Sequence, residues 1–236
     1  MEVEAAQPSR PASRTRLLCW IFFVGLIAAI NYAARITSGG SGVGNKSTHD
    51  AVYSYSTFVG GTILYAVWLG IVLLIVIDRF DLLALRHPRT GWPKALGLAV
   101  AAVVAVFVVE GLVSLLPLPQ SPGKEQGLTP THWEPAHAGA FAANLVLFAV
   151  IAPFVEELTF RGAGQSLIGQ FLSRVPTILL IGVAFGLAHG LVEALLVLVP
   201  FGIALAVLRD RTDSTYPGML VHGLFNGTAL VLAVLS

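Results

Sequence analysis

Two adjacent carboxylates beside an apolar segment are the residues of this chain best suited to chemistry. Glu156 and Glu157 directly follow a largely apolar run of eighteen residues, 138–155, and Arg161 comes four residues after Glu157. A charged side chain at the edge of a membrane-spanning helix is costly unless a partner neutralises it or a function uses it. Since the chain has only 14 Lys and Arg and 13 Asp and Glu in 236 residues, three charges clustered here favour an enzyme.

The spacing within this cluster distinguishes the two carboxylates. On a helix, Glu157 and Arg161 share a face and can pair, whereas Glu156 is turned away by about 100° and has no such partner. We therefore predict that Glu157 and Arg161 form an ion pair that supports the site, and that Glu156 is free to act. In the alternative interpretation, all three side chains simply reach the cytoplasmic edge of the membrane.

Two histidines lie inside predicted spans, His189 and His222, and the other four are in predicted loops: His49, His87, His132 and His137. An imidazole in a span usually faces the interior of the bundle and marks a site, although a single one can serve only as a hydrogen bond between helices. Asn226 follows His222 by four residues and shares its face, where its amide could donate to an oxyanion.

Glycines recur every fourth residue near both histidines. His189 is preceded by Gly182 and Gly186 and followed by Gly190, and His222 is followed by Gly223 and Gly227. Small residues at this spacing let helices approach closely, which would bring side chains of different helices together. Packing alone explains the glycines equally well.

A carboxylate, two imidazoles and an amide suit the hydrolysis of a peptide bond. The carboxylate would take a proton from water, and the donors would hold the oxyanion of the tetrahedral intermediate. The same set could instead bind zinc through Glu and His, with water as a fourth ligand. Residue types alone do not separate these mechanisms, and the spacing is not that of the H-E-x-x-H zinc-protease signature.

Composition places these residues in a membrane protein. The chain is 56% hydrophobic and 11% charged, with a mean hydropathy of +0.80, whereas a globular domain carries about 25% charged residues. A net charge of +1 and the lack of a basic stripe argue against a nucleic-acid partner. The single cysteine, Cys19, excludes an internal disulfide and a Cys-rich metal cluster.

The apolar segments predict an all-α, polytopic integral membrane bundle of about seven transmembrane helices. They are approximately Leu17–Ala34, Phe58–Ile77, Ala95–Leu116, Ala138–Val155, Pro176–Leu191, Ala194–Leu208 and Pro217–Leu235, and most approach the roughly 20 residues that span a bilayer. We expect a disordered cytoplasmic N-terminus (1–16), three N-terminal helices with their loops (17–137) and a catalytic core (138–236). Arginines before the first segment also allow a signal peptide, although an uncleaved anchor fits as well.

The fifth and sixth segments could form one long helix or a tight hairpin. With a cytoplasmic N-terminus and a hairpin, 11 of the 14 basic residues, Arg161 included, lie on the cytoplasmic side, as the positive-inside rule requires. A single crossing would place Arg209 and Arg211 outside. We therefore predict the hairpin in a multi-pass protein of the plasma membrane, with a site open toward the cytoplasm.

Two features stay unexplained by this topology. Glu156 and His222 are expected near the cytoplasmic side, whereas His189 would lie about 20 Å up an upright helix, so its segment must start lower, tilt or be shifted. Glu110 lies inside the third segment, where a polar contact within the bundle is the expected role.

Three motifs carry a resemblance to a known family: E-E-x-x-x-R (Glu156, Glu157, Arg161), F-x-x-x-H (Phe185, His189) and H-x-x-x-N (His222, Asn226). In this order they resemble the CPBP family of CAAX-processing and bacteriocin-processing intramembrane proteases, also called the Abi family, over about Ala138–Ala233. Each motif alone is weak, and the set is specific.

The resemblance implies an intramembrane endopeptidase in which Glu156 activates water with help from His189. It also implies that His222 and Asn226 stabilise the oxyanion, while Glu157 and Arg161 hold the site together. Eukaryotic members cleave prenylated CAAX proteins. The family is commonly labelled metalloprotease, but a glutamate-dependent mechanism requires no cofactor, so zinc stays open.

The expected partners are the lipid bilayer and a peptide or protein substrate, lipidated or not. A high Ala, Val and Gly content is consistent with a bacterial source, and a host that does not prenylate proteins would offer no CAAX tails. Two other classes remain: a non-enzymatic bacteriocin-immunity or scaffold protein, and a proton-coupled transporter, against which the lack of an internal repeat counts.

Overall fold

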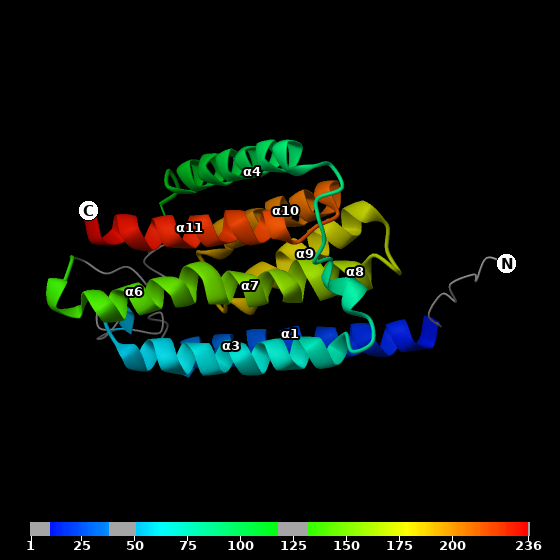
Figure 1. The fold of residues 1–236 in the computed structure, drawn as a ribbon, viewed down its shortest axis with the longest axis horizontal. Coiled ribbons are helices and arrows are strands. Elements are labelled where there is room, and N and C mark those ends of the chain that lie inside the picture. The colour runs from blue at the N-terminus through cyan, green and yellow to red at the C-terminus, as the bar shows by residue number, and fades with distance from the viewer. Residues whose placement is uncertain (1–9, 38–50, 118–131, 236) are drawn as a thin grey trace.

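The computed structural model describes residues 10–37, 51–117 and 132–235, and this part of the chain is all-helical without a strand. Its helices lie side by side along one long axis (Figure 1). The elements before the helix that carries the E-E-x-x-x-R motif (the motif helix) are α1 (Arg10–Thr37), α3 (Tyr55–Ile75), the 3₁₀ turn η1 (Phe80–Leu83) and α4 (Trp92–Val113). After it come α9 (Arg174–Ala188), α10 (Leu195–Thr212) and α11 (Tyr216–Leu235).

The motif helix is one continuous helical stretch, Pro135–Ile168. It consists of the 3₁₀ turn η2 (Pro135–His137), α6 (Ala138–Val146), the π-helical η3 (Leu147–Ile151), α7 (Ala152–Glu157), the π-helical η4 (Leu158–Gly164) and α8 (Gln165–Ile168). Both glutamates of the motif therefore lie at the end of a short α-helical segment between two π-helical ones. Such wide turns inside α-helices are frequent at functional sites.

Five of the seven predicted segments are long and apolar enough to cross a membrane: Ser13–Thr37, Tyr55–Ile75, Trp92–Val113, Pro135–Ile168 and Tyr216–Leu235. The fifth segment, α9, is apolar but has only 15 residues. The sixth segment, α10, has 18 residues and carries three charges at its C-terminal end, 209–211. The chain is thus a multi-pass membrane protein.

Large apolar side chains cover the outside of the bundle. Phe22 is 73% exposed, Val100 64% and Leu64 60%. Water would disfavour so many exposed apolar residues on one molecule, whereas lipid tails accommodate them. The helices α1, α3 and α4 therefore present lipid-facing sides, as the composition predicts.

The motif helix continues beyond the point where the predicted segment ends. That segment stops at Val155 because three charged residues follow within six positions, but Glu157 and Arg161 are fully buried and paired, so the helix runs on to Ile168. Arg161 is therefore not a cytoplasmic surface charge, and its place in the positive-inside count was wrong.

This extension also removes the height mismatch between the glutamate and the histidine. Glu156 is 12 residues from the end of the motif helix at Ile168, or about 18 Å at 1.5 Å per residue. His189 follows Arg174, the first residue of α9, by 15 residues, or about 22 Å. Both side chains therefore lie at a similar level along the bundle, as the contact between them requires.

The fifth and sixth segments form the predicted hairpin. An added Cβ at Gly182 would come within 2.4 Å of the Ile203 side chain, and one at Gly186 within 2.6 Å of Val199, so α9 and α10 run antiparallel in close contact. The turn between them contains Gly190 with φ of +67°, a backbone conformation that favours glycine.

Two expectations at the N-terminal end of the chain are affected. Residues 10–16 belong to α1, where the Arg16 Nη1 atom donates to the Ile75 carbonyl at 2.7 Å, so the expectation of disorder was wrong for them. Residues 1–9 lie outside the described residues, as do 38–50 and 118–131 of the two expected loops. Glu110, half-buried on α4, has no hydrogen-bond partner for its carboxylate among the described residues, so the expected polar contact is not found there.

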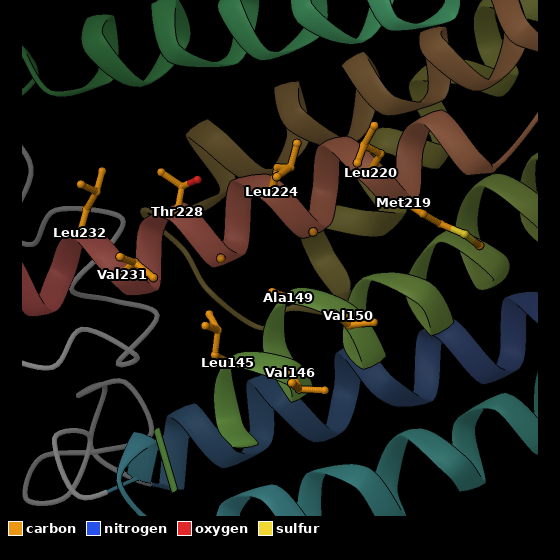
Figure 2. Close-up of a pocket in the computed structure, with 12 residues that line it drawn as sticks. Leu145, Val146, Ala149, Val150, Met219, Leu220, Leu224, Thr228, Val231 and Leu232 are labelled. Carbon is orange, nitrogen blue, oxygen red and sulfur yellow. The ribbon is translucent and has the colours of Figure 1, made fainter. Parts of the chain in front are cut away.

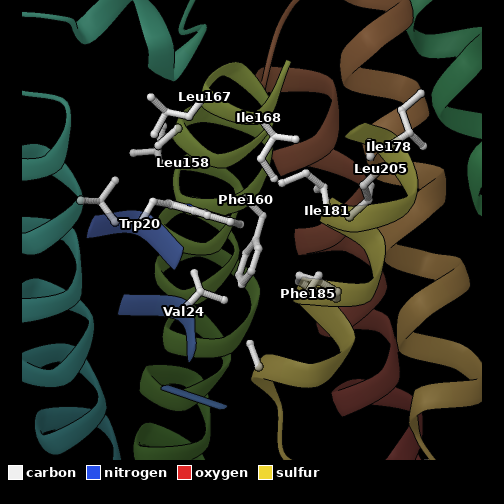
Figure 3. Close-up of a cluster of buried hydrophobic side chains, with 14 of the residues drawn as sticks. Trp20, Val24, Leu158, Phe160, Leu167, Ile168, Ile178, Ile181, Phe185 and Leu205 are labelled. Atoms are coloured by element: carbon white, nitrogen blue, oxygen red, sulfur yellow. The ribbon is translucent and has the colours of Figure 1, made fainter. Parts of the chain in front are cut away.

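One apolar core joins the N-terminal helices to the motif helix (Figure 3). Trp20 of α1 packs edge-on against Phe160 with ring centroids 6.3 Å apart, and Phe160 packs against Phe185 of α9 at 5.3 Å. Val72 of α3 is fully buried in the same cluster. The division of the chain at residue 137 stays a prediction from sequence, since α1 and α3 share this core with the helices that follow.

Candidate active site

Three helices bring a carboxylate and two imidazoles together inside the bundle. The Oε2 atom of Glu156, at the end of α7, lies 3.7 Å from Nε2 of His222 on α11 and 4.0 Å from Nε2 of His189 at the end of α9. The side chains of Glu156 and His222 are 10% and 3% exposed, whereas that of His189 is 28% exposed. The cluster is therefore almost enclosed and opens on the His189 side.

The F-x-x-x-H motif fixes His189. Its Nδ1 lies 2.8 Å from the Phe185 carbonyl one turn earlier, and because a carbonyl oxygen can only accept, Nδ1 carries the hydrogen and Nε2 is left facing Glu156. The Phe185 ring is fully buried and packs 4.7 Å from the His189 ring and 4.4 Å from the Arg161 guanidinium. Phe185 thus holds both a histidine and the arginine of the first motif.

Glu157 supports His222 from the opposite side. Its Oε1 accepts a hydrogen bond from Arg161 Nη1 at 2.7 Å and lies 3.1 Å from His222 Nδ1. Arg161 also donates through Nη2 to the Gly202 carbonyl at 3.0 Å. Glu157 and Arg161 are completely buried, so the predicted ion pair is present and holds the imidazole that faces Glu156.

Asn226 lies one turn beyond His222, where its Nδ2 donates to the Phe148 carbonyl at 3.1 Å. In the π-helical segment η3, backbone N–H groups reach five residues back, as the Ala152 N–H does to Leu147. The next donor in this pattern would be residue 153, which is a proline without an N–H. Asn226 therefore supplies the hydrogen bond that Phe148 would otherwise lack.

One neighbour of Glu156 was not predicted from the sequence. The Tyr65 hydroxyl on α3 donates to Glu156 Oε1 at 2.7 Å. One turn later on α3, Trp68 Nε1 donates to Thr159 Oγ1 at 2.8 Å. Buried Tyr and Trp side chains usually need a hydrogen-bond partner for their polar atoms, so their position within an apolar segment was the available signal.

The donor set does not match a metal centre. Within residues 10–37, 51–117 and 132–235, no three His, Cys, Asp or Glu side chains are grouped so that they could hold a metal ion. The zinc site that the residue types allow is thus not supported by their arrangement, and we derive no step through a metal.

An apolar groove of about 630 Å³ lies between α11 and the first half of the motif helix. Figure 2 shows Leu145, Val146 and Ala149 on one side and Leu224, Thr228 and Leu232 on the other. The groove also includes Gly223, the residue that follows His222 on α11. Its walls are almost entirely hydrocarbon.

The fold and this cluster define a multi-pass helical membrane protein with a Glu–His site inside its bundle. Residues 138–228 match the family described as type II CAAX prenyl endopeptidase Rce1-like. This match confirms the resemblance to the CPBP family of CAAX proteases, over a segment that contains all three motifs and begins after α4. No curated protein and no solved structure matches the chain.

Proposed function

We propose that this protein is an intramembrane endopeptidase that hydrolyses peptide bonds of membrane-associated proteins or peptides, with Glu156 as the general base. The observation that carries the proposal is the convergence of His189 Nε2 and His222 Nε2 on one oxygen of Glu156, deep within an apolar bundle. The match of residues 138–228 to CAAX endopeptidases supports the same reaction class.

In the first step, a water molecule binds between Glu156 and His189, on the side of the cluster that is open. Glu156 takes a proton from this water, and the water oxygen attacks the carbonyl carbon of the scissile bond. His189 orients the water through Nε2, because its Nδ1 is fixed on the Phe185 carbonyl.

The carbonyl oxygen then becomes an oxyanion that needs hydrogen-bond donors. His222 supplies one from Nε2 when its imidazole is protonated, while Nδ1 donates to Glu157. In the second step the carbon–nitrogen bond breaks, and Glu156 returns its proton to the leaving amine. Water thus adds OH to the carbon and H to the nitrogen, and the site is restored.

Asn226 would be the second donor to the oxyanion. Its amide nitrogen carries two hydrogens, and the bond to the Phe148 carbonyl uses one of them. The other is available to substrate. We therefore propose a double role, in which the same amide completes the π-helical turn and contributes to catalysis.

The orientation that we propose for the membrane rests on the basic residues. Several of them gather at one end of the bundle, where Arg86 pairs with Asp213 and Arg174 pairs with Asp210. The Arg89 N–H donates to the Thr212 carbonyl at the same end. We propose that this end is cytoplasmic in a bacterial plasma membrane, with the N-terminus on the same side.

The substrate is expected to be lipid-associated, because the apolar groove between α11 and the motif helix suits the hydrocarbon part of such a molecule. The test is cleavage, by purified protein in liposomes, of internally quenched peptides with and without an S-farnesyl cysteine three residues from the C-terminus. We expect cleavage by the native protein and none by Glu156→Gln. Equal cleavage by the two proteins would contradict the proposal.

A further inference from the structure

We propose that Tyr65 is a positioning residue of the active site, so that α3, which lies outside the segment matched to the protease family, completes the catalytic machinery. This inference rests on the proposed function, because it concerns the orientation of the general base Glu156. Its basis is the hydrogen bond of 2.7 Å from the Tyr65 hydroxyl to Glu156 Oε1.

The two oxygens of the Glu156 carboxylate have different surroundings. Oε1 accepts from Tyr65, and Oε2 faces the Nε2 atoms of His189 and His222. The terminal torsion of a glutamate is broad and has little intrinsic preference, so the carboxylate plane needs an external restraint. A short hydrogen bond from a hydroxyl to a carboxylate is strong and directional. Tyr65 therefore holds Oε1 in place and leaves Oε2 to receive the proton of the attacking water.

Tyr65 is itself held rigidly. Its ring stacks on the Trp68 ring, with centroids 5.6 Å apart and planes 18° apart. Trp68 is fixed in turn, because its Nε1 donates to Thr159 Oγ1 at 2.8 Å and its ring packs edge-on against Phe23. Thr159 is fully buried and donates to the Val155 carbonyl at 2.7 Å.

These contacts join α3 to the motif helix at two points in the same register. Tyr65 to Glu156 and Trp68 to Thr159 are both separated by 91 residues, so the two helices run parallel and each pair is one turn from the other. The Trp68–Thr159 hydrogen bond aligns the two helices. With the helices aligned, the Tyr65–Glu156 hydrogen bond orients the carboxylate. The two bonds therefore have separable roles.

The direct test removes only the Tyr65 hydroxyl. In liposomes with the quenched S-farnesyl peptide, we expect Tyr65→Phe to lower kcat about 10- to 100-fold, the range expected for a misplaced catalytic group, with KM changed less than about twofold because no substrate contact is lost. Tyr55→Phe is the matched control, since Tyr55 is on the same helix and 60% exposed; its kcat should equal that of the native protein.

A double-mutant cycle separates positioning from a merely structural bond between helices. Glu156→Asp shortens the side chain by one methylene, so its carboxylate no longer reaches the tyrosine. If Tyr65 acts through Glu156, adding Tyr65→Phe to Glu156→Asp lowers kcat less than about twofold further. A loss as large as in the native background would mean that Tyr65 acts only on packing, and the proposal would be wrong.

A second readout does not depend on cleavage. The infrared carboxylate band of Glu156, taken as the difference between the native protein and Glu156→Gln, should shift in Tyr65→Phe and not in Tyr55→Phe. An unshifted band would overturn the proposal. Failure of the proposed function is distinct: native-like cleavage by Glu156→Gln would refute it, whereas an inactive Glu156→Gln with a fully active Tyr65→Phe would refute only the role of Tyr65.

Discussion

Glu157 Oε1 lies 3.1 Å from His222 Nδ1, so the second glutamate of the motif holds the histidine that faces the first. The two adjacent carboxylates thus have different tasks, as their positions on a helix require. Glu157 is fully buried and shared between Arg161 and His222. Glu156 remains beside the opening of the cluster, next to the half-exposed His189.

The buried pair predicts a large and partner-dependent loss of stability. Arg161→Met leaves the Glu157 carboxylate buried without its cation, and we expect unfolding to become easier by about 3–5 kcal/mol. Adding Glu157→Gln to Arg161→Met should recover part of this loss, because no uncompensated charge remains. Thermal unfolding in detergent measures both variants, and a double variant less stable than Arg161→Met would contradict the pairing.

Gly218 predicts a steric effect at the same pair. A Cβ added to it would lie 2.5 Å from Glu157 Oε2, so Gly218→Ala should displace the carboxylate and destabilise the protein by about 1–3 kcal/mol. Gly97→Ala on α4 is the control, because a Cβ there meets nothing within 4 Å, and alanine in an open helical position is normally favourable. Equal melting temperatures for the two variants would show that Glu157 tolerates displacement.

The contacts of this site that were predictable from the sequence are those within one helix, because their spacing follows the helical period. The pairing of Glu157 with Arg161 was predictable, because four residues separate them on one helix. Apolar runs predicted where the helices lie, but two ends differed: α1 begins at Arg10 rather than Leu17, and the motif helix continues to Ile168 because Glu157 and Arg161 neutralise each other. Apolar runs alone could not show that buried charges were paired.

Contacts between distant helices were less accessible. The positions of residues within α3 do not relate Tyr65 to Glu156. The two residues are 91 positions apart in the sequence, and their contact depends on how the two helices pack. The role of Asn226 had a local signal that went unused: Pro153 inside a predicted span leaves a backbone carbonyl without its helical donor, and a nearby amide is a suitable replacement.

The double role of Asn226 predicts that stability and activity can be separated. Asn226→Ala should cost about 1 kcal/mol of stability, because the Phe148 carbonyl loses its donor, and should lower kcat. Pro153→Ala restores a backbone N–H to that carbonyl, so in the double variant the stability should return while kcat stays low. Melting curves and cleavage rates measured on the same samples test this, and recovery of both would leave Asn226 a purely structural role.

Removal of metal is expected to leave cleavage intact. The His, Cys, Asp and Glu side chains that the structure describes do not form a three-ligand metal site. The native protein should therefore cleave the peptide equally before and after dialysis against a chelator, with metal content measured alongside. Activity lost on dialysis and restored by zinc alone would show that the reaction depends on a metal.

The most direct test of the central claim compares native protein with Glu156→Gln and Glu157→Gln in liposomes containing the quenched S-farnesyl peptide. We expect cleavage by the native protein and none by Glu156→Gln, which keeps the side-chain length and should fold with a native melting temperature. Glu157→Gln should be less stable, because it leaves Arg161 buried without its counter-charge. Cleavage by Glu156→Gln at the native rate would contradict the assignment of Glu156 as the general base.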